Sequence, residues 1–242
     1  QPFDTRLHAW DGGTIADGQS FNDAGELVKK HLVLNENSVN DIIAAITDTK
    51  ATVATKKTTA FTERPKPPFI TSSLQQEAIR KLKWTAKRTM SVAQRLYENG
   101  WITYMRTDST TLSSQALEAA RSLITANYGK EFVPSKPRIY ATTTTGAQEA
   151  HEAIRPAGEK FKTLQEANRD LEASEQKLYE LIWKRTVASQ MKDAKGERLR
   201  ATFTTKKAEF VATGKTYLFQ GFRLAYVEGA ADEASALAEK EK

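Results

Sequence analysis

A proline-rich stretch divides the chain into two kinds of sequence: Arg64-Pro65-Lys66-Pro67-Pro68. Proline has no backbone N–H and a fixed φ angle, so three prolines in five residues can continue neither a helix nor an interior strand. Such segments are stiff and partly extended. We therefore expect a domain boundary here.

The sequence before this linker favours strands. Residues 1–37 combine extended runs with turn signals such as Gly12-Gly13. Residues 51–63 are rich in threonine, valine and phenylalanine, which is typical of a strand. Between them, the pair Ser38 and Asp41 has the spacing of a capping box and predicts a short helix over residues 38–47.

After the linker the apolar residues repeat at helical spacing. Asn99-Gly100 is expected to end one helix, because glycine adopts the left-handed conformation of a helix cap. From Arg198 the apolar period returns to two, and we expect a hairpin or meander that extends to Val227. The predicted helical segments are residues 72–82, 87–98, 113–128, 148–154 and 171–191.

The order of strands, helices and strands predicts an α+β fold with two domains. We expect residues 1–69 and 196–242 to form one discontinuous β-rich domain. Residues 70–195 would be an all-helical domain inserted into it, because an insertion whose ends lie close together is commonly tolerated.

The amino-acid composition excludes several kinds of functional site. The 242 residues include no cysteine, which excludes disulfides, thiolate metal sites and cysteine nucleophiles, and is typical of the cytoplasm. No apolar run is long enough to span a membrane. The chain opens on Gln1 without an initiator methionine, and we expect it to be a segment of a longer protein.

The net charge of +6 is concentrated in the helical part. Residues 70–195 contain 20 Lys and Arg against 14 Asp and Glu, whereas the remainder contains 16 of each. Between Arg80 and Arg106 there are seven basic residues and one acid, Glu98. This distribution favours a polyanionic partner such as nucleic acid. The alternative is a solvated helix face that binds nothing.

One short stretch combines a nucleophile with a cation: residues 100–109 read GWITYMRTDS. Tyr104 offers a phenolic oxygen that can attack phosphorus. Arg106 is permanently charged and can form paired hydrogen bonds with phosphate oxygens. Because a phenol is mostly protonated at neutral pH, Tyr104 needs such a neighbour to act as a nucleophile. The alternative for Tyr104 is a half-buried packing residue.

Four motifs, in this order and spacing, resemble those of type IA DNA topoisomerases, and most closely the bacterial topoisomerase I group. Besides residues 100–109, they are PFITSSLQQEA at 68–78, AQRLYE at 93–98 and QEAHEAIRP at 148–156. The resemblance is strongest over about residues 67–191. It implies a helical, tyrosine-bearing domain that interrupts a β-rich arch domain.

The resemblance also implies an activity. Tyr104 would cleave single-stranded DNA, form a 5′-phosphotyrosyl link and leave a free 3′-hydroxyl. Another strand passes through the gap, religation reverses the step, and negatively supercoiled DNA is relaxed without ATP. This chemistry implies bacterial cytoplasm, at the nucleoid, as the location.

Roles for further residues follow from the same resemblance. His151 is expected to approach the tyrosine loop and contact the scissile phosphate, with Asp108 tuning it. Thr103 and Thr107 are secondary candidates for contacts with phosphate.

Two arginines and three aromatic residues are open to two interpretations. Arg155 is a candidate phosphate clamp, or it forms an ion pair with Glu152 or Glu149; Arg95 is a candidate DNA contact. The aromatic residues either stack on bases or belong to the core, and they are Trp84, Tyr97 and Trp101.

The resemblance further implies that part of the enzyme lies outside this chain. The Mg²⁺ of type IA enzymes is held by acidic residues of a separate toprim domain, and this sequence contains neither Asp-x-Asp-x-Glu nor another set of metal ligands. We expect a central fragment that binds no metal, does not relax DNA alone and requires the toprim and remaining domains as partners. We expect a monomer or an artificial dimer.

Two other functions remain open. One is a non-catalytic module that binds single-stranded DNA, and the other is a hinge segment that binds nothing well. Steep weakening of binding by salt would separate the first from the second.

Overall fold

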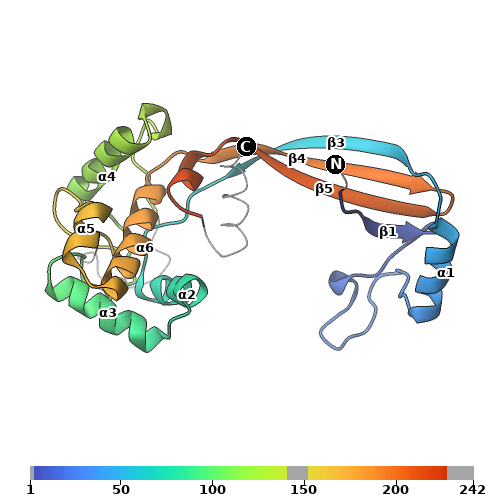
Figure 1. The fold of residues 1–242 in the computed structure, drawn as a ribbon, viewed down its shortest axis with the longest axis horizontal. Coiled ribbons are helices and arrows are strands. Elements are labelled where there is room, and N and C mark those ends of the chain that lie inside the picture. Colours follow the sequence, from blue (N-terminus) through green and yellow to red (C-terminus); the bar gives the residue numbers. More distant parts are fainter. Residues whose placement is uncertain (1–2, 141–151, 228–242) are drawn as a thin grey trace. The chain divides into compact units, whose positions relative to one another are not determined.

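The computed structural model describes residues 3–140 and 152–227 (Figure 1). Contacts divide the chain into two compact units, which are described separately. One comprises Gln1–Phe61 and Gly196–Leu218, and the other comprises Thr62–Lys195 and Phe219–Lys242. The fold is mixed, as expected, with an antiparallel sheet and, among the described residues, six α-helices.

The first unit is built on a five-stranded sheet with the order β2-β1-β5-β4-β3. Its strands are β1 (Arg6–Trp10), β2 (Gly13–Thr14), β3 (Thr52–Glu63), β4 (Ala194–Thr205) and β5 (Ala208–Phe219). Antiparallel pairing sets Arg6 opposite Val211, and Trp10 opposite Gly13. The predicted strand over 51–63 is thus confirmed, and β4 begins four residues before the expected Arg198.

A tight turn joins β1 to β2. Asp11 and Gly12 both have positive φ angles, 49° and 81°, as a type I′ hairpin turn requires. A short 3-10 helix, η1 (Gly18–Ser20), follows. The turn that Gly12-Gly13 predicted is therefore confirmed.

The helix of this unit, α1 (Glu36–Ile46), begins earlier than the capping pattern predicted. Its N-cap is Asn35, whose side chain accepts a hydrogen bond from the Ser38 N–H at 2.9 Å, while the Asn35 N–H donates to the Ser38 hydroxyl at 2.8 Å. Ser38 is therefore the third residue of the helix and not its cap, because Asn35 completes the same reciprocal pattern one turn earlier.

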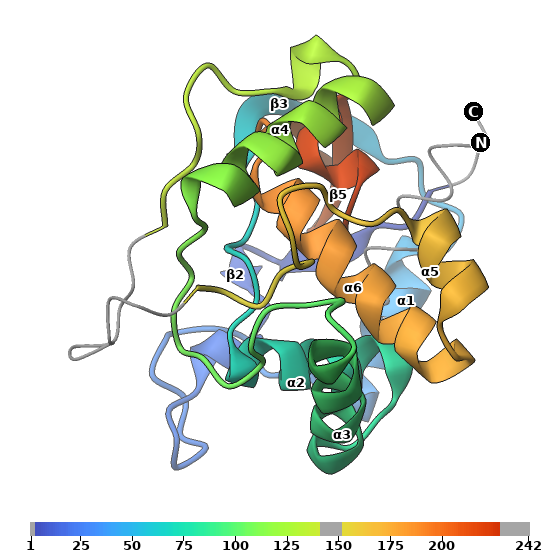
Figure 2. The same cartoon turned by 90° about the vertical axis from the view of Figure 1, so that its left-hand side faces the viewer.

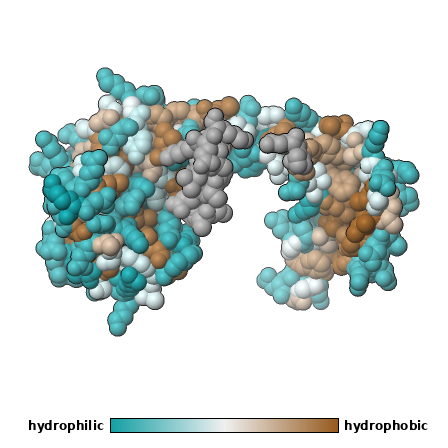
Figure 3. All heavy atoms as spheres, in the orientation of Figure 1, coloured by the Kyte–Doolittle hydropathy of each residue, from teal (hydrophilic) through white to brown (hydrophobic). Residues whose placement is uncertain are grey.

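Large apolar side chains remain exposed on this unit (Figure 3). On α1, Ile43 is exposed whereas its neighbour Ile42 is buried, and Leu32 and Val33 are exposed just before the helix. Exposed apolar surface of this kind is typical of regions that contact another protein segment.

The second unit is helical, with α2 (Thr71–Leu82), α3 (Ala86–Glu98), α4 (Ser114–Asn127), α5 (Leu164–Asp170) and α6 (Ala173–Ser189). A 3-10 turn, η2 (Lys130–Phe132), follows α4. Helix α6 crosses the middle of the unit, with α2 and α3 on one side and α4 on the other (Figures 1 and 2). More than half of its residues are buried. Among the described residues, no helix is both long and apolar enough to cross a membrane.

Three expectations need correction in this unit. Helix α5 was not predicted, although Thr163 and Glu166 form a capping box at its start. The predicted helical turn over 148–154 is wrong in its described part, because Ile154 is extended and forms an antiparallel bridge with Phe69. The hairpin expected to extend to Val227 ends at Phe219, and a 3-10 helix, η3 (Gly221–Leu224), follows.

Candidate active site

The candidate site begins where α3 ends. Gly100 has a φ of 70°, and its N–H donates to the Tyr97 carbonyl at 2.9 Å while the Trp101 N–H donates to the Leu96 carbonyl at 2.8 Å. These bonds close the last turn as a left-handed glycine cap does, which confirms the predicted helix end. The chain then leaves the helix as an irregular loop that carries Tyr104.

Segment 153–156 holds the first half of this loop. Ile102 forms an antiparallel bridge with Pro156, and the Thr103 N–H donates to the Arg155 carbonyl at 2.9 Å. The Thr103 hydroxyl donates to the Ala153 carbonyl at 2.7 Å and accepts from the Arg155 N–H at 3.0 Å. In this structure the Thr103 hydroxyl therefore holds the backbone beside Tyr104 in place.

The first residue of α2 holds the second half. The Thr71 hydroxyl accepts from the Thr107 N–H at 2.9 Å and donates toward the Met105 and Thr107 carbonyls at 2.9 and 3.0 Å. The Thr71 N–H also donates to the Thr107 carbonyl at 2.9 Å. Sequence reasoning assigned no role to Thr71, although it lies in the motif at residues 68–78.

The loop alternates between buried and exposed side chains. Met105, Thr107 and Ser109 are buried, whereas Arg106 and Asp108 are exposed. Tyr104 is 43% exposed. Because both halves of the loop are anchored, the buried residues fix which way the others point. The predicted nucleophile, cation and acid are therefore all accessible to a ligand.

The ring of Tyr104 rests edge-on against Tyr97, with 5.2 Å between ring centroids and 65° between ring planes. Tyr97 lies on the last turn of α3 and is 41% exposed, so its ring is open to a base. The other two aromatic candidates, Trp84 and Trp101, are buried and belong to the core, and Trp101 packs edge-on against Tyr179.

Arg106 and Asp108 border a shallow groove of about 430 Å³. The first turn of α2 forms its other side, through Thr71, Ser72 and Gln75. The N-terminal end of a helix carries partial positive charge and N–H groups without partners in the helix. A guanidinium beside such an end suits the binding of an anion.

Arg155 forms the ion pair that was the alternative to a phosphate clamp. Its side chain is buried, with Nη2 2.5 Å from Glu152 Oε2, and Nη1 donates to the carbonyls of Pro156 and Gly158 at 2.8 and 3.2 Å. Glu152 also accepts from the N–H of Ser113, the N-cap of α4, at 2.7 Å. Burial raises the pKa of Glu152, but hydrogen bonds from Arg155 and Ser113 outweigh it and hold the pKa below its ordinary value.

Arg95 joins two helices. Its Nε donates to Glu175 Oε1 at 2.9 Å, which ties α3 to the first turn of α6. Contact of Arg95 or Arg155 with phosphate stays a prediction that would require a change of these bonds. His151 lies outside the described residues, so its approach to Tyr104 also stays a prediction.

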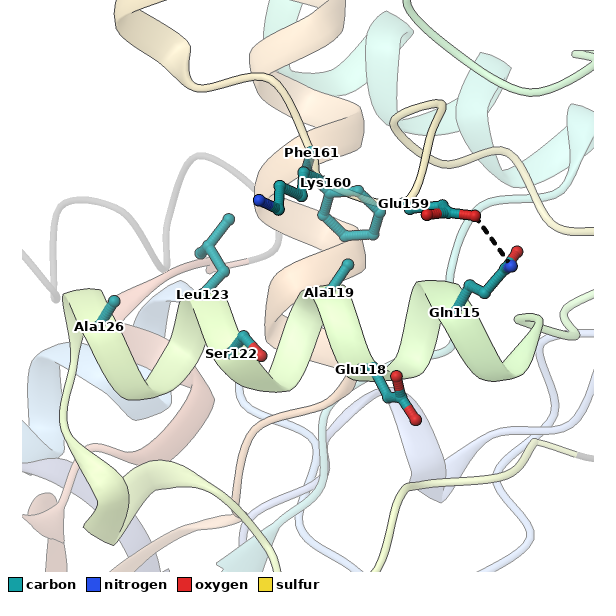
Figure 4. A pocket seen from close by; sticks show the side chains of 9 residues that line it. All are labelled: Gln115, Glu118, Ala119, Ser122, Leu123, Ala126, Glu159, Lys160 and Phe161. Atoms are coloured by element: carbon teal, nitrogen blue, oxygen red, sulfur yellow. Dashed lines mark hydrogen bonds between the residues drawn. The ribbon is translucent and has the colours of Figure 1, made fainter.

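A larger hollow, of about 830 Å³, lies away from this site between α4 and residues 159–161 (Figure 4). Gln115 donates to Glu159 across it at 3.0 Å, and Phe161 and Leu123 contribute apolar surface. Its lining offers no nucleophile comparable to Tyr104. Among the described residues, no three His, Asp or Glu side chains lie close enough together to hold a metal ion.

Comparison with known proteins gives consistent matches. A family described as DNA topoisomerase matches residues 12–242. DNA topoisomerase 1 of Mycobacterium leprae is 48% identical in an alignment of 248 positions, which covers 96% of this chain and 26% of that protein. DNA topoisomerase 1 of Streptomyces coelicolor is 48% identical in an alignment of 243 positions, which covers 98% of this chain and 25% of that protein.

A solved structure is also similar, that of full-length topoisomerase I from Thermotoga maritima. The two structures superpose with a TM-score of 0.67 at 36% sequence identity, and the match covers 84% of this chain and 35% of the Thermotoga maritima chain. This chain therefore spans about a quarter of the length of the curated relatives and about a third of the solved one.

Proposed function

Because the chain belongs to the bacterial DNA topoisomerase I family, we propose that it is the strand-cleaving part of a type IA enzyme with Tyr104 as its nucleophile. The observation that carries the proposal is the anchored loop from which Tyr104, Arg106 and Asp108 point outward. A loop fixed at both halves keeps a nucleophile in position while leaving it accessible.

The reaction is a reversible transfer of one phosphodiester bond. The Tyr104 phenolic oxygen loses its proton and attacks phosphorus, and the bond from phosphorus to the 3′-oxygen breaks. The 5′-phosphate stays on Tyr104, while the leaving 3′-oxygen takes a proton and becomes a hydroxyl. Religation runs the same steps backward, so the bond energy is retained and no ATP is consumed.

Arg106 supplies the charge that this reaction needs. A guanidinium beside the phenol favours the phenolate and stabilises the charge on the transferring phosphoryl oxygens. The groove between Arg106 and the first turn of α2 suits the scissile or the adjacent phosphate. Asp108 borders the same groove and orients a neighbouring donor, for which His151 is the candidate.

The substrate that we propose is a single DNA strand. Tyr97 offers an exposed ring beside Tyr104, and base stacking on such a ring is worth about 1–3 kcal/mol for each base. The basic residues of the α2–α3 region supply attraction to phosphates.

We further propose that the helical unit is an insertion in the β-rich unit and that the chain works only within a longer polypeptide. The helices α2 to α6 follow one another between β3 and β4, and the chain spans about a quarter of its relatives. The remaining domains, with the Mg²⁺ site, are its partners, and the chain alone does not relax DNA. Action on chromosomal DNA would locate the whole protein at the bacterial nucleoid.

Complementation tests this proposal. The chain is mixed with the separately produced remainder of the protein, Mg²⁺ and a labelled single-stranded oligonucleotide, and covalent adducts are mapped by mass spectrometry. We expect an adduct on Tyr104 that is lost in Tyr104→Phe. Tyr97→Phe is the matched control, since it removes the same hydroxyl from the neighbouring ring and is expected to retain the adduct.

Two results would contradict the proposal. An adduct that survives Tyr104→Phe would exclude Tyr104 as the nucleophile. Tight, salt-sensitive oligonucleotide binding without any adduct would favour a non-catalytic single-strand-binding module.

A further inference from the structure

Part of the sheet is solvated on both sides. Residues 52–60 of β3 are all exposed, although an antiparallel sheet usually packs one side against a core. On β4 and β5, Arg198, Arg200 and residues 213–216 are exposed as well. This part of the sheet therefore offers a broad surface at which a ligand can bind.

Three cations surround a hollow on this surface. Its volume is about 540 Å³, and it is lined by Arg198 and Arg200 of β4 and by Thr213, Gly214 and Lys215 of β5. None of these five described residues is acidic. Like charges repel one another, and an anion bound among these three cations would offset their repulsion.

Lys215 is held in place by two aromatic rings. Its Nζ lies 4.6 Å from the centroid of Phe61 and 4.5 Å from that of Tyr217, and it donates to the Tyr217 hydroxyl. The two rings meet edge-on, with 5.3 Å between centroids. A lysine ordered before binding loses less side-chain entropy when it meets a phosphate.

The rings lie on the same side of the sheet as the hollow. A Cβ on Gly196 would come within 2.7 Å of the Phe61 ring, so that ring covers the glycine. Side chains alternate along a strand, and Gly196 therefore shares its side with Arg198 and Arg200. By the same rule Lys57 shares the side of Phe61.

Strand β1 adds another cation to this side. The exposed Arg6 pairs with Val211, which shares its side with Thr213 and Lys215. The acid on this side of β5 is Glu209, four residues before Thr213 and 3.9 Å from His8. We call the cationic surface the sheet patch, and it consists of Arg6, Lys57, Phe61, Arg198, Arg200, Thr213, Lys215 and Tyr217.

We propose that the sheet patch is a second DNA-binding surface, which holds a single strand by its phosphates in the hollow and by its bases against Phe61 and Tyr217. Cations interleaved with aromatic rings on an open sheet are the chemistry that single strands require, since each nucleotide offers both a charge and a flat ring. The choice of DNA among polyanions rests on the proposed function.

The test uses the whole chain and a labelled oligothymidylate that contains a photo-crosslinking thiothymidine. Affinity is measured against salt, and crosslinked peptides are identified by mass spectrometry. The variant Arg198→Gln/Arg200→Gln/Lys215→Gln is compared with Lys30→Gln/Lys50→Gln/Lys56→Gln, which removes the same charge from exposed positions of the same unit outside the sheet patch.

We expect the patch variant to bind about ten- to a hundredfold more weakly at moderate salt, with a slope of log affinity against log salt that is shallower by about 2. Crosslinks to β3, β4 and β5 disappear, while those near Tyr97 and Tyr104 remain. The control variant retains the sheet crosslinks. If the patch variant melts at a lower temperature than the unmodified chain, Arg198→Gln/Arg200→Gln replaces it in the test. This variant leaves Lys215 against its two rings, and the slope of log affinity against log salt should be shallower by about 1.4.

Three results would overturn the proposal: no crosslink to these strands in the unmodified chain, an equal loss in the control variant, or equal competition by duplex DNA. Failure of the proposed function looks different. Sheet crosslinks without crosslinks near Tyr104 would argue against cleavage by this chain and leave the sheet patch in place.

Discussion

Replacing Thr71 by valine removes the hydroxyl that joins α2 to the Tyr104 loop and keeps the shape of the side chain. The Thr107 N–H, now bonded to that hydroxyl at 2.9 Å, would be buried without an acceptor, at a cost of about 1–3 kcal/mol. The lost donation to the Met105 and Thr107 carbonyls adds about 0.5–1.5 kcal/mol. The added methyl group returns about 0.8 kcal/mol.

The net loss for Thr71→Val is therefore about 2 kcal/mol, which lowers the melting temperature of the helical unit by about 4–8 °C. Urea unfolding measures the free energy, and amide exchange at residues 105–109 should accelerate relative to α4. Thr125→Val is the control, because its hydroxyl only donates to the Arg121 carbonyl one turn earlier in α4, at 3.0 Å. We expect it to cost less than about 0.5 kcal/mol. Equal losses in the two variants would refute the anchoring role of Thr71.

Three further substitutions test other parts of the helical unit and its loop. Glu152→Gln leaves the Arg155 guanidinium buried without its counter-charge and should cost about 2–3 kcal/mol at neutral pH. The pKa of Glu152 is lowered in the folded state, so the stability difference between the unmodified chain and Glu152→Gln is complete above about pH 4.5 and shrinks as the pH falls further. Melting curves whose difference stays constant down to acid pH would contradict this. Burial raises the pKa of Tyr140 to about 12, so its neutral hydroxyl stabilises the fold fully below pH 10 and loses about 2–3 kcal/mol as the pH rises to 12. Urea unfolding across that range should show a larger loss in the unmodified chain than in Tyr140→Phe, in which burial still raises the pKa of Tyr128 and Tyr179; parallel curves would exclude the linkage. Gly100→Ala forces an alanine to a φ of 70° and should cost about 1–2 kcal/mol in urea unfolding. Gly214→Ala, where a Cβ meets nothing within 4 Å, should be nearly neutral, and equal costs would show that the φ angle does not matter.

The sequence predicted the helix ends where a single residue determines them. Gly100 ends α3 as expected, because few other residues adopt its φ angle. At α1 two polar residues compete for the same role, and Asn35 caps the helix in place of Ser38. Local patterns are ambiguous in such cases, since both residues can complete a capping box.

Pairing between strands explains another error. A hairpin or meander was expected to extend to Val227, and glycine weakens a strand interior, yet β5 runs through Gly214 beside β4 and ends at Phe219. The strand ends instead before Gly221, which has a φ of 53° and lies against the backbone of Lys192 and Asp193. Sequence near Gly214 contains no information about those neighbours.

The candidate site was predictable in its residue types and not in its geometry. The motif at 100–109 identified Tyr104 and Arg106 as chemically suited to phosphate transfer. Which side chains point outward depends on Thr71 and segment 153–156, and these contacts join residues 36 to 52 positions apart. Thr103 illustrates this: its hydroxyl is bonded to the backbone around Arg155, which the motif did not predict, and its contact with phosphate stays a prediction.

These long separations also bear on how the protein is synthesised. A loop held by partners 36 positions before it and 52 positions after it cannot become ordered until the later partner has left the ribosome. Local helices form in about a microsecond, but closing loops of this length costs entropy that the final contacts must repay. A nascent chain that ends before Pro156 therefore contains Tyr104 without the framework that positions it, and the reactive geometry arises only after α2, α3 and α4 have been synthesised.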